Sequence, residues 1–287
     1  MLQAPQRTAL SGPALIRLLA RLADVDVPES RQSLSDRLSQ WLGWTDAIAL
    51  SSALSGTPPA VAAGARSFGS AEESEYVRAR SSLAKNITGD SVFAADRRRG
   101  PAHASAQAAS QNAPAEPVAD YAVFRQRYLS IQQSMEMAIG NLRGRLRSML
   151  AARTPAMARL AVVDAVMERA LSERERNLLS AVPVLLAGHF ERLRAAEQAT
   201  LAAAEAAEAA ESAESAESAE SAESAESAES ADGAGSNAAS SAASNPAAPT
   251  PGAWLNVFRK DMQSVLLAEL DVRLQPVEGL LAALRAS

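Results

Sequence analysis

The side chains best suited to catalysis or metal binding are scarce in this sequence. The chain has two histidines, His103 and His189, and no cysteine. His103 lies in a low-complexity stretch, whereas His189 precedes Phe190 on an apolar helical stripe. Two isolated histidines do not supply a metal-ligand set, and no acid–His–Ser grouping indicates a nucleophile. We therefore expect no catalytic, cofactor-binding or metal-binding residues, and we expect His189 to be a packed or partly exposed helix residue.

Basic side chains form two short clusters that could contact an anionic partner. Residues 97–99 are three consecutive arginines, whereas Arg143, Arg145 and Arg147 alternate with other residues. Arg143 and Arg147 are one helical turn apart, so this cluster could meet an acidic partner or the glutamate repeat of the chain itself. No aromatic platform is interleaved with these clusters and the whole chain is acidic, so we do not expect nucleic-acid binding.

The acidity of the chain comes from one segment. Residues 201–250 contain 10 of the 33 acidic residues and no basic residue. The rest of the chain has 23 acids and 28 bases, a net charge of +5. The surface charge of the other segments is therefore positive overall.

Composition and periodicity predict an all-α protein, a helical bundle or coiled-coil-like hairpins with long disordered low-complexity linkers. Aromatic residues make up only 4% of the chain, and strand-like runs of Val, Ile and Thr are absent. The expected organisation is an N-terminal short-helix unit at 1–56, a loop plus an amphipathic helix at about 70–88 within 57–93, a flexible linker at 94–117, a central helical module at 118–200, a Glu-Ser-Ala repeat and flexible tether at 201–252, and a C-terminal amphipathic helix at 253–287. In the N-terminal unit, the third short helix carries Ile48 and Leu54 and ends near Gly56.

A heptad seam gives the strongest periodic signal and is our candidate interaction seam. Apolar residues recur with 3-4-3-4-3-4 spacing, at Tyr121, Phe124, Tyr128, Ile131, Met135, Ala138 and Leu142. Such a seam serves either an antiparallel hairpin within one chain or a dimer. The stripes that follow at 157–171 and 178–193 favour packing within the chain. Gly140 and Gly144 indicate a bend, or a place where another helix approaches closely.

Three sequence signals divide the region after this seam. Thr154 followed by Pro155 predicts a cap and a new helix. Ser172 and Glu175 fit a capping box, which predicts another helix start. Pro183 predicts a kink or a further start.

A triplet repeat of Glu, Ser and Ala begins at Glu211. A period of three drifts around a helix of 3.6 residues per turn, so the repeat forms no apolar seam. It is either a solvated, partly helical rod or a charged, extended linker.

The C-terminal segment again carries a large apolar face. Five of its residues form our candidate C-terminal contact, with an expected role as a detachable contact: Trp254, Leu255, Phe258, Met262 and Val265. Leaving such side chains exposed is costly, so this helix must pack on the protein, on another copy or on a partner.

Three segments carry a family resemblance. They are the opening RTALSGPALIRLLARL, the stretch from Leu38 to Asp46 and the central DYAVFRQRYLSIQQSME. Together they resemble an uncharacterised bacterial family, a domain of unknown function, over most of the chain outside the two low-complexity stretches. The resemblance brings no activity and no site residues. It implies gene neighbours similar to stator components and to peptidoglycan-binding outer-membrane proteins, and thus an accessory role in a cell-envelope complex.

From these observations we expect a non-enzymatic helical assembly or adaptor protein. It would bind a protein partner or associate with itself. The alternative is an amphipathic coat protein on membrane or storage-granule surfaces, similar to phasins. We expect no transmembrane segment, a cytoplasmic location that includes the inner face of the membrane, and no more than peripheral membrane contact.

Overall fold

The computed structural model of the chain describes residues 13–28, 32–56, 70–93, 120–223 and 252–286. Within these ranges the chain is helical and has no strand, which confirms the all-α class. His103 and the arginines at 97–99 lie outside the described residues. The helices are α1 (Ala14–Ala23), α2 (Leu34–Trp41), α3 (Trp44–Ser55), α4 (Ser70–Thr88), α5 (Tyr121–Ala151), α6 (Pro155–Ser180), α7 (Val182–Glu223) and α8 (Ala253–Ala286).

The described residues fall into two compact units. The first unit comprises those up to Phe190 together with those from Phe258 onward, and the second comprises those from Glu191 to Val257. In the second unit the backbone N–H of Gly252 donates to Oε1 of Glu197 at 2.8 Å. The first unit contains the candidate interaction seam and most of α8.

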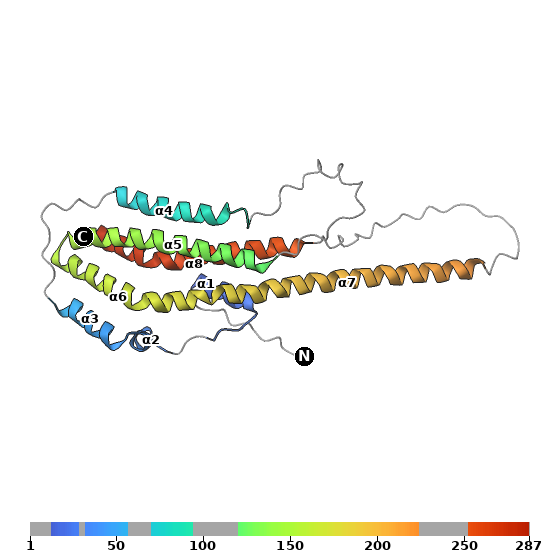
Figure 1. Ribbon diagram of the computed structural model, residues 1–287, viewed down its shortest axis with the longest axis horizontal. Helices are drawn as coiled ribbons and strands as arrows, with labels where there is room; N and C mark the ends of the chain where they lie inside the picture. The colour runs from blue at the N-terminus through green and yellow to red at the C-terminus, as the bar shows by residue number, and fades with distance from the viewer. Residues whose placement is uncertain (1–12, 29–31, 57–69, 94–119, 224–251, 287) are drawn as a thin grey trace, which may run out of the picture. The chain divides into compact units, whose positions relative to one another are not determined.

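In the first unit α4, α5, α6 and α8 run side by side, and α3 lies against α6 (Figure 1). The helix α8 connects the others through its side chains. Arg80 of α4 pairs with Asp271 at 2.7 Å, and Arg273 pairs with Glu175 of α6 at 3.2 Å. The side of α8 that faces the bundle is fully buried at Leu266 and nearly so at Leu270. The C-terminal helix is therefore part of the core of this unit.

The seam on α5 is buried within a single chain, as the preferred reading predicted. Tyr128 and Met135 are fully buried, whereas Ala138 is half-buried and its neighbour Ile139 is buried instead. A straight helix drifts by about 20° per heptad relative to a repeat of 3.5, so the buried position moves by one residue after two heptads. Gln132, which the apolar pattern did not include, is also buried.

The helix boundaries confirm two of the three signals. Thr154 caps α6 by accepting the N–H of Met157 at 3.2 Å, and Pro183 lies in the first turn of α7. The expected start at Ser172 is wrong, because α6 continues through it. The Ser172 hydroxyl donates to the carbonyl of Arg169 at 3.1 Å, a local bond available to serine inside a helix.

The Glu-Ser-Ala repeat is helical as far as Glu223, where the description of α7 ends. The helix thus continues through four triplets, in agreement with the rod reading for this part.

Gly140 and Gly144 do not mark a close helix approach. A Cβ on Gly140 would meet no atom within 4 Å, and one on Gly144 would lie 3.9 Å from the Arg147 side chain. Gly140→Ala is therefore expected to raise the free energy of unfolding by about 0.5–1 kcal/mol, because it restricts the unfolded chain without a clash. Urea unfolding followed by circular dichroism measures this change.

Gly56→Ala is the control for this substitution. Its Cβ would lie 2.6 Å from the Ser52 carbonyl oxygen, which is backbone. This variant is expected to lose stability. Destabilisation by Gly140→Ala would mean that the α5 glycine has a packing role.

Candidate functional site

A buried polar network joins α5 to α8. Glu269 is fully buried and accepts hydrogen bonds from the Tyr128 hydroxyl at 2.6 Å and from Gln132 Nε2 at 2.9 Å. Arg273 Nε donates to the same carboxylate at 2.8 Å. Burial, followed by the nearby Glu269 carboxylate, raises the pKa of Tyr128 well above its usual range. The network therefore holds one carboxylate charge inside the protein, with a guanidinium as its counter-charge.

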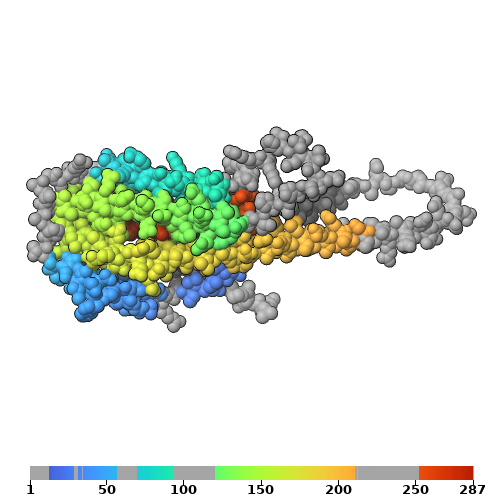
Figure 2. Space-filling model, in the orientation of Figure 1, coloured from blue at the N-terminus to red at the C-terminus, as the bar shows by residue number. Residues whose placement is uncertain are grey.

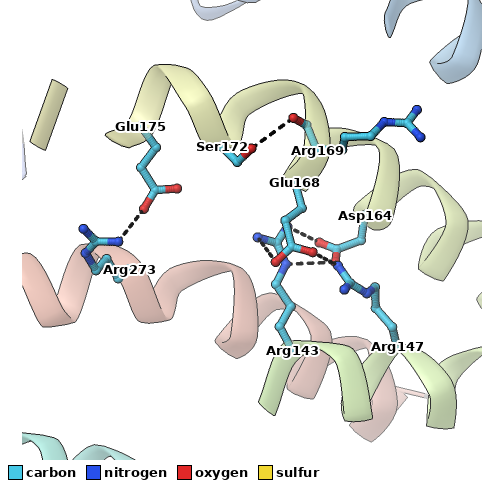
Figure 3. Close-up of polar contacts among 8 residues, drawn as sticks. All are labelled: Arg143, Arg147, Asp164, Glu168, Arg169, Ser172, Glu175 and Arg273. Atoms are coloured by element: carbon cyan, nitrogen blue, oxygen red, sulfur yellow. Dashed lines mark hydrogen bonds and ion pairs between the residues drawn. The ribbon is translucent and has the colours of Figure 1, made fainter. Parts of the chain in front are cut away.

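A second network joins α5 to α6 (Figure 3). Arg143 makes a two-pronged contact with Asp164, through Nε at 2.9 Å and Nη2 at 2.7 Å. Arg147 contacts the same Asp164 at 3.2 Å and also pairs with Glu168. Asp164 and Glu168 are one turn apart on α6, so both carboxylates face the two arginines.

This second network corrects the expectation for the arginine cluster. Arg143 and Arg147 are neutralised by α6, and Arg145 pairs with Glu75 of α4. The glutamate repeat is not needed as their counter-charge. The sequence could not show this, because the acids that pair with Arg143 lie 21 and 25 residues further along the chain.

A cleft of about 490 Å³ lies between α5, α6 and α8, with Trp41 of α2 at its edge. The guanidinium of Arg174 lies 5.5 Å from the centre of the Trp41 ring. The two networks supply part of the wall of this cleft, and other polar residues line it as well. Its apolar lining residues include Ile139, Leu171, Leu178, Val272 and Pro276. Glu168 and Glu175 on this wall each pair with an arginine, so these charges hold the helices together.

His189, the histidine within the described residues, is part of a helix-to-helix contact. His189 Nε2 lies 2.8 Å from Asp261 Oδ2, so this side chain links α7 to α8. The prediction of a packed or partly exposed helix residue is therefore confirmed. In the part of the chain that the structure describes, no group of three or more His, Asp or Glu residues is arranged to hold a metal ion.

The candidate interaction seam meets the candidate C-terminal contact inside the first unit. Phe124, Phe190 and Phe258 pack edge to face or tilted, with ring centres 5.0–6.1 Å apart. Tyr121 is half-buried, and its hydroxyl donates to the carbonyl of Pro183. Burial raises the pKa of Tyr121 to about 12. Buried seam residues further along are Ile131, Met135 and Leu142.

Three residues of the candidate C-terminal contact are core residues. Phe258, Met262 and Val265 are fully buried. The expectation that they form a detachable surface is therefore wrong. Trp254 and Leu255 are half-buried and belong to the second unit. The apolar face was recognised correctly, but periodicity alone does not show whether a face is covered by its own chain or by another.

The outer face of α3 carries Trp44, the most exposed large hydrophobic residue among the described ones. Trp44 is 83% exposed, Ile48 51% and Leu54 54%. The opposite side of the helix, with Ala49, Leu50 and Ala53, is half-buried, and α3 packs on α6. Small side chains on that side allow close packing. Figure 2 shows α3, in blue, on the outside of the unit beside α6.

Trp44 was not predicted as a site residue. Ile48 and Leu54 were predicted to lie on a helix, within a packed N-terminal unit. The available signal was the composition of residues 44–55, in which Asp46 is the only charged residue. A helix with one charged residue presents mostly uncharged side chains to water on whichever side is exposed.

Together the fold and these surfaces define an all-α bundle protein in which the buried Glu269 carboxylate is paired with Arg273 and the outer face of α3 is uncharged. The chain belongs to the family described as Protein of unknown function (DUF3348), whose model matches residues 1–286. This confirms the resemblance to a domain of unknown function. Neither a curated protein nor a solved structure matches the chain. None of the helices in the described ranges is long and apolar enough to cross a membrane.

Proposed function

We propose that this protein is a non-enzymatic helical assembly or adaptor protein that binds a protein partner through the outer face of α3. The observation that carries the proposal is the 83% exposure of Trp44 beside Ile48 and Leu54. Tryptophan is among the residues most enriched at the energetic centres of protein interfaces. The proposal places the protein in the cytoplasm, including the inner face of the membrane, where an accessory of an envelope complex would work.

The structure behind α3 supports this role. Its inner side is backed by α6, which is itself paired with α5. At the two ends of this contact, Arg174 stacks over Trp41 and Arg159 Nη2 donates to the Gly56 carbonyl at 3.3 Å. A helix fixed in this way loses little further backbone freedom on binding.

Trp44→Ser is expected to weaken partner binding at least about tenfold, because it removes the largest apolar side chain of the face. The measurement is affinity purification of the tagged full chain from its native host, with partners identified and quantified by mass spectrometry. Since Trp44 is exposed, the thermal unfolding midpoint should stay within a few degrees of the wild type.

Val184→Ser is the matched control, because Val184 is 70% exposed on α7. This variant should recover the same partner as the wild type. Equal recovery with Trp44→Ser would contradict the proposal. If Trp44 instead governed co-sedimentation with phospholipid vesicles, the phasin-like coat role would replace it.

A further inference from the structure

The outer face of α3 is uncharged along its whole length. Its exposed residues are Trp44, Thr45, Ala47, Ile48, Ser51, Ser52, Leu54 and Ser55. Asp46, the one charged residue of the helix, is half-buried on the other side. The surface therefore offers apolar side chains and hydroxyls but no charge for a partner to complement.

We propose that this face pairs with the same face of a second copy of the chain. In a symmetric dimer each surface meets itself, and residues near the two-fold axis meet their own counterparts. A charge at that position would meet a like charge, whereas the hydroxyl of Ser51 can both donate and accept. An uncharged face of apolar groups and hydroxyls is thus complementary to itself. The inference rests on the proposed function and names the partner of the same surface.

The exposed area indicates how strong this contact is. A tryptophan side chain buries up to about 250 Å². At the exposures given above, Trp44, Ile48 and Leu54 together offer roughly 400 Å² per protomer, against roughly 800 Å² in an interface of standard size. Because this area is below that of an interface of standard size, we expect a weak dimer and test for it at micromolar concentrations.

The first test is the mass of the purified full chain in solution. Sedimentation equilibrium across the micromolar range should show a monomer–dimer equilibrium for the wild type and for Val184→Ser. Trp44→Ser should shift the dissociation constant upward by at least about tenfold. A wild type that stays monomeric throughout, or a Trp44→Ser dimer of unchanged strength, would overturn the proposal.

The second test distinguishes pairing through this face from other modes of association. Ser51 lies at the centre of the face between Ile48 and Leu54, and it is exposed, so a charge there should not disturb folding. Ser51→Glu and Ser51→Lys are each expected to be monomeric, because each puts like charges at the two-fold axis. An equimolar mixture of the two should regain the dimer.

The mixture is the decisive sample. Dimers in either single variant, or no dimers in the mixture, would overturn pairing of this face with itself. Circular dichroism and the unfolding midpoint confirm that both variants are folded. The failure of this inference is distinguishable from failure of the proposed function. A strictly monomeric wild type that loses its host partner on Trp44→Ser would remove the dimer and keep the adaptor role.

Discussion

Glu269→Ala is expected to lower the free energy of unfolding by about 3–5 kcal/mol. The substitution leaves the Arg273 side chain, only 8% exposed, without its nearest counter-charge. It also removes the acceptor of the buried Tyr128 hydroxyl, and it leaves the buried Gln132 amide with only the Leu179 carbonyl, at 3.3 Å. Each unsatisfied buried group adds a desolvation cost. Equilibrium urea unfolding of the full chain, followed by circular dichroism, measures the change.

The expected loss depends on burial, so an exposed ion pair is the matched control. Asp271 lies two residues along α8 and pairs with Arg80 at 2.7 Å, but the two side chains are 58% and 48% exposed. Asp271→Ala should cost no more than about 1 kcal/mol. Similar losses for the two variants would show that the Glu269 network does not hold α8 in place.

Local signals in the sequence predicted the elements of this fold well. The heptad on α5, the cap at Thr154 and the start at Pro183 each depend on residues within a few positions, and all are present in the structure. The Ser172 box failed because the same short motif is compatible with the interior of a long helix. A local pattern states what a residue can do, but not whether the surrounding helix uses it.

The sequence did not predict which residues of other helices contact the charged and apolar faces of each helix. Glu269 contacts Tyr128 across 141 residues, and nothing in either helix identifies the other. The exposure of the outer face of α3 could not be predicted for a related reason. Its composition shows that it lacks charge, but only the position of α6 shows which side of the helix is left open.

Phe258→Ala is expected to destabilise the chain by about 3–5 kcal/mol. Phe258 is fully buried at the point where α5, α7 and α8 meet, and its ring centre lies 5.0 Å from that of Phe190 and 5.3 Å from that of Phe124. Removing the ring leaves a cavity among aromatic side chains that cannot collapse fully. Urea unfolding measures the loss.

This prediction tests whether α8 is a core helix or a detachable one. Val257, the preceding residue, is 48% exposed, and Val257→Ala should change stability by no more than about 0.5 kcal/mol. A detachable helix would give a small loss at both positions, because the remaining helices would stay folded without it. A large loss at Phe258 alone means that the helix is required for the bundle. In that case α8 is not free to detach and bind a partner.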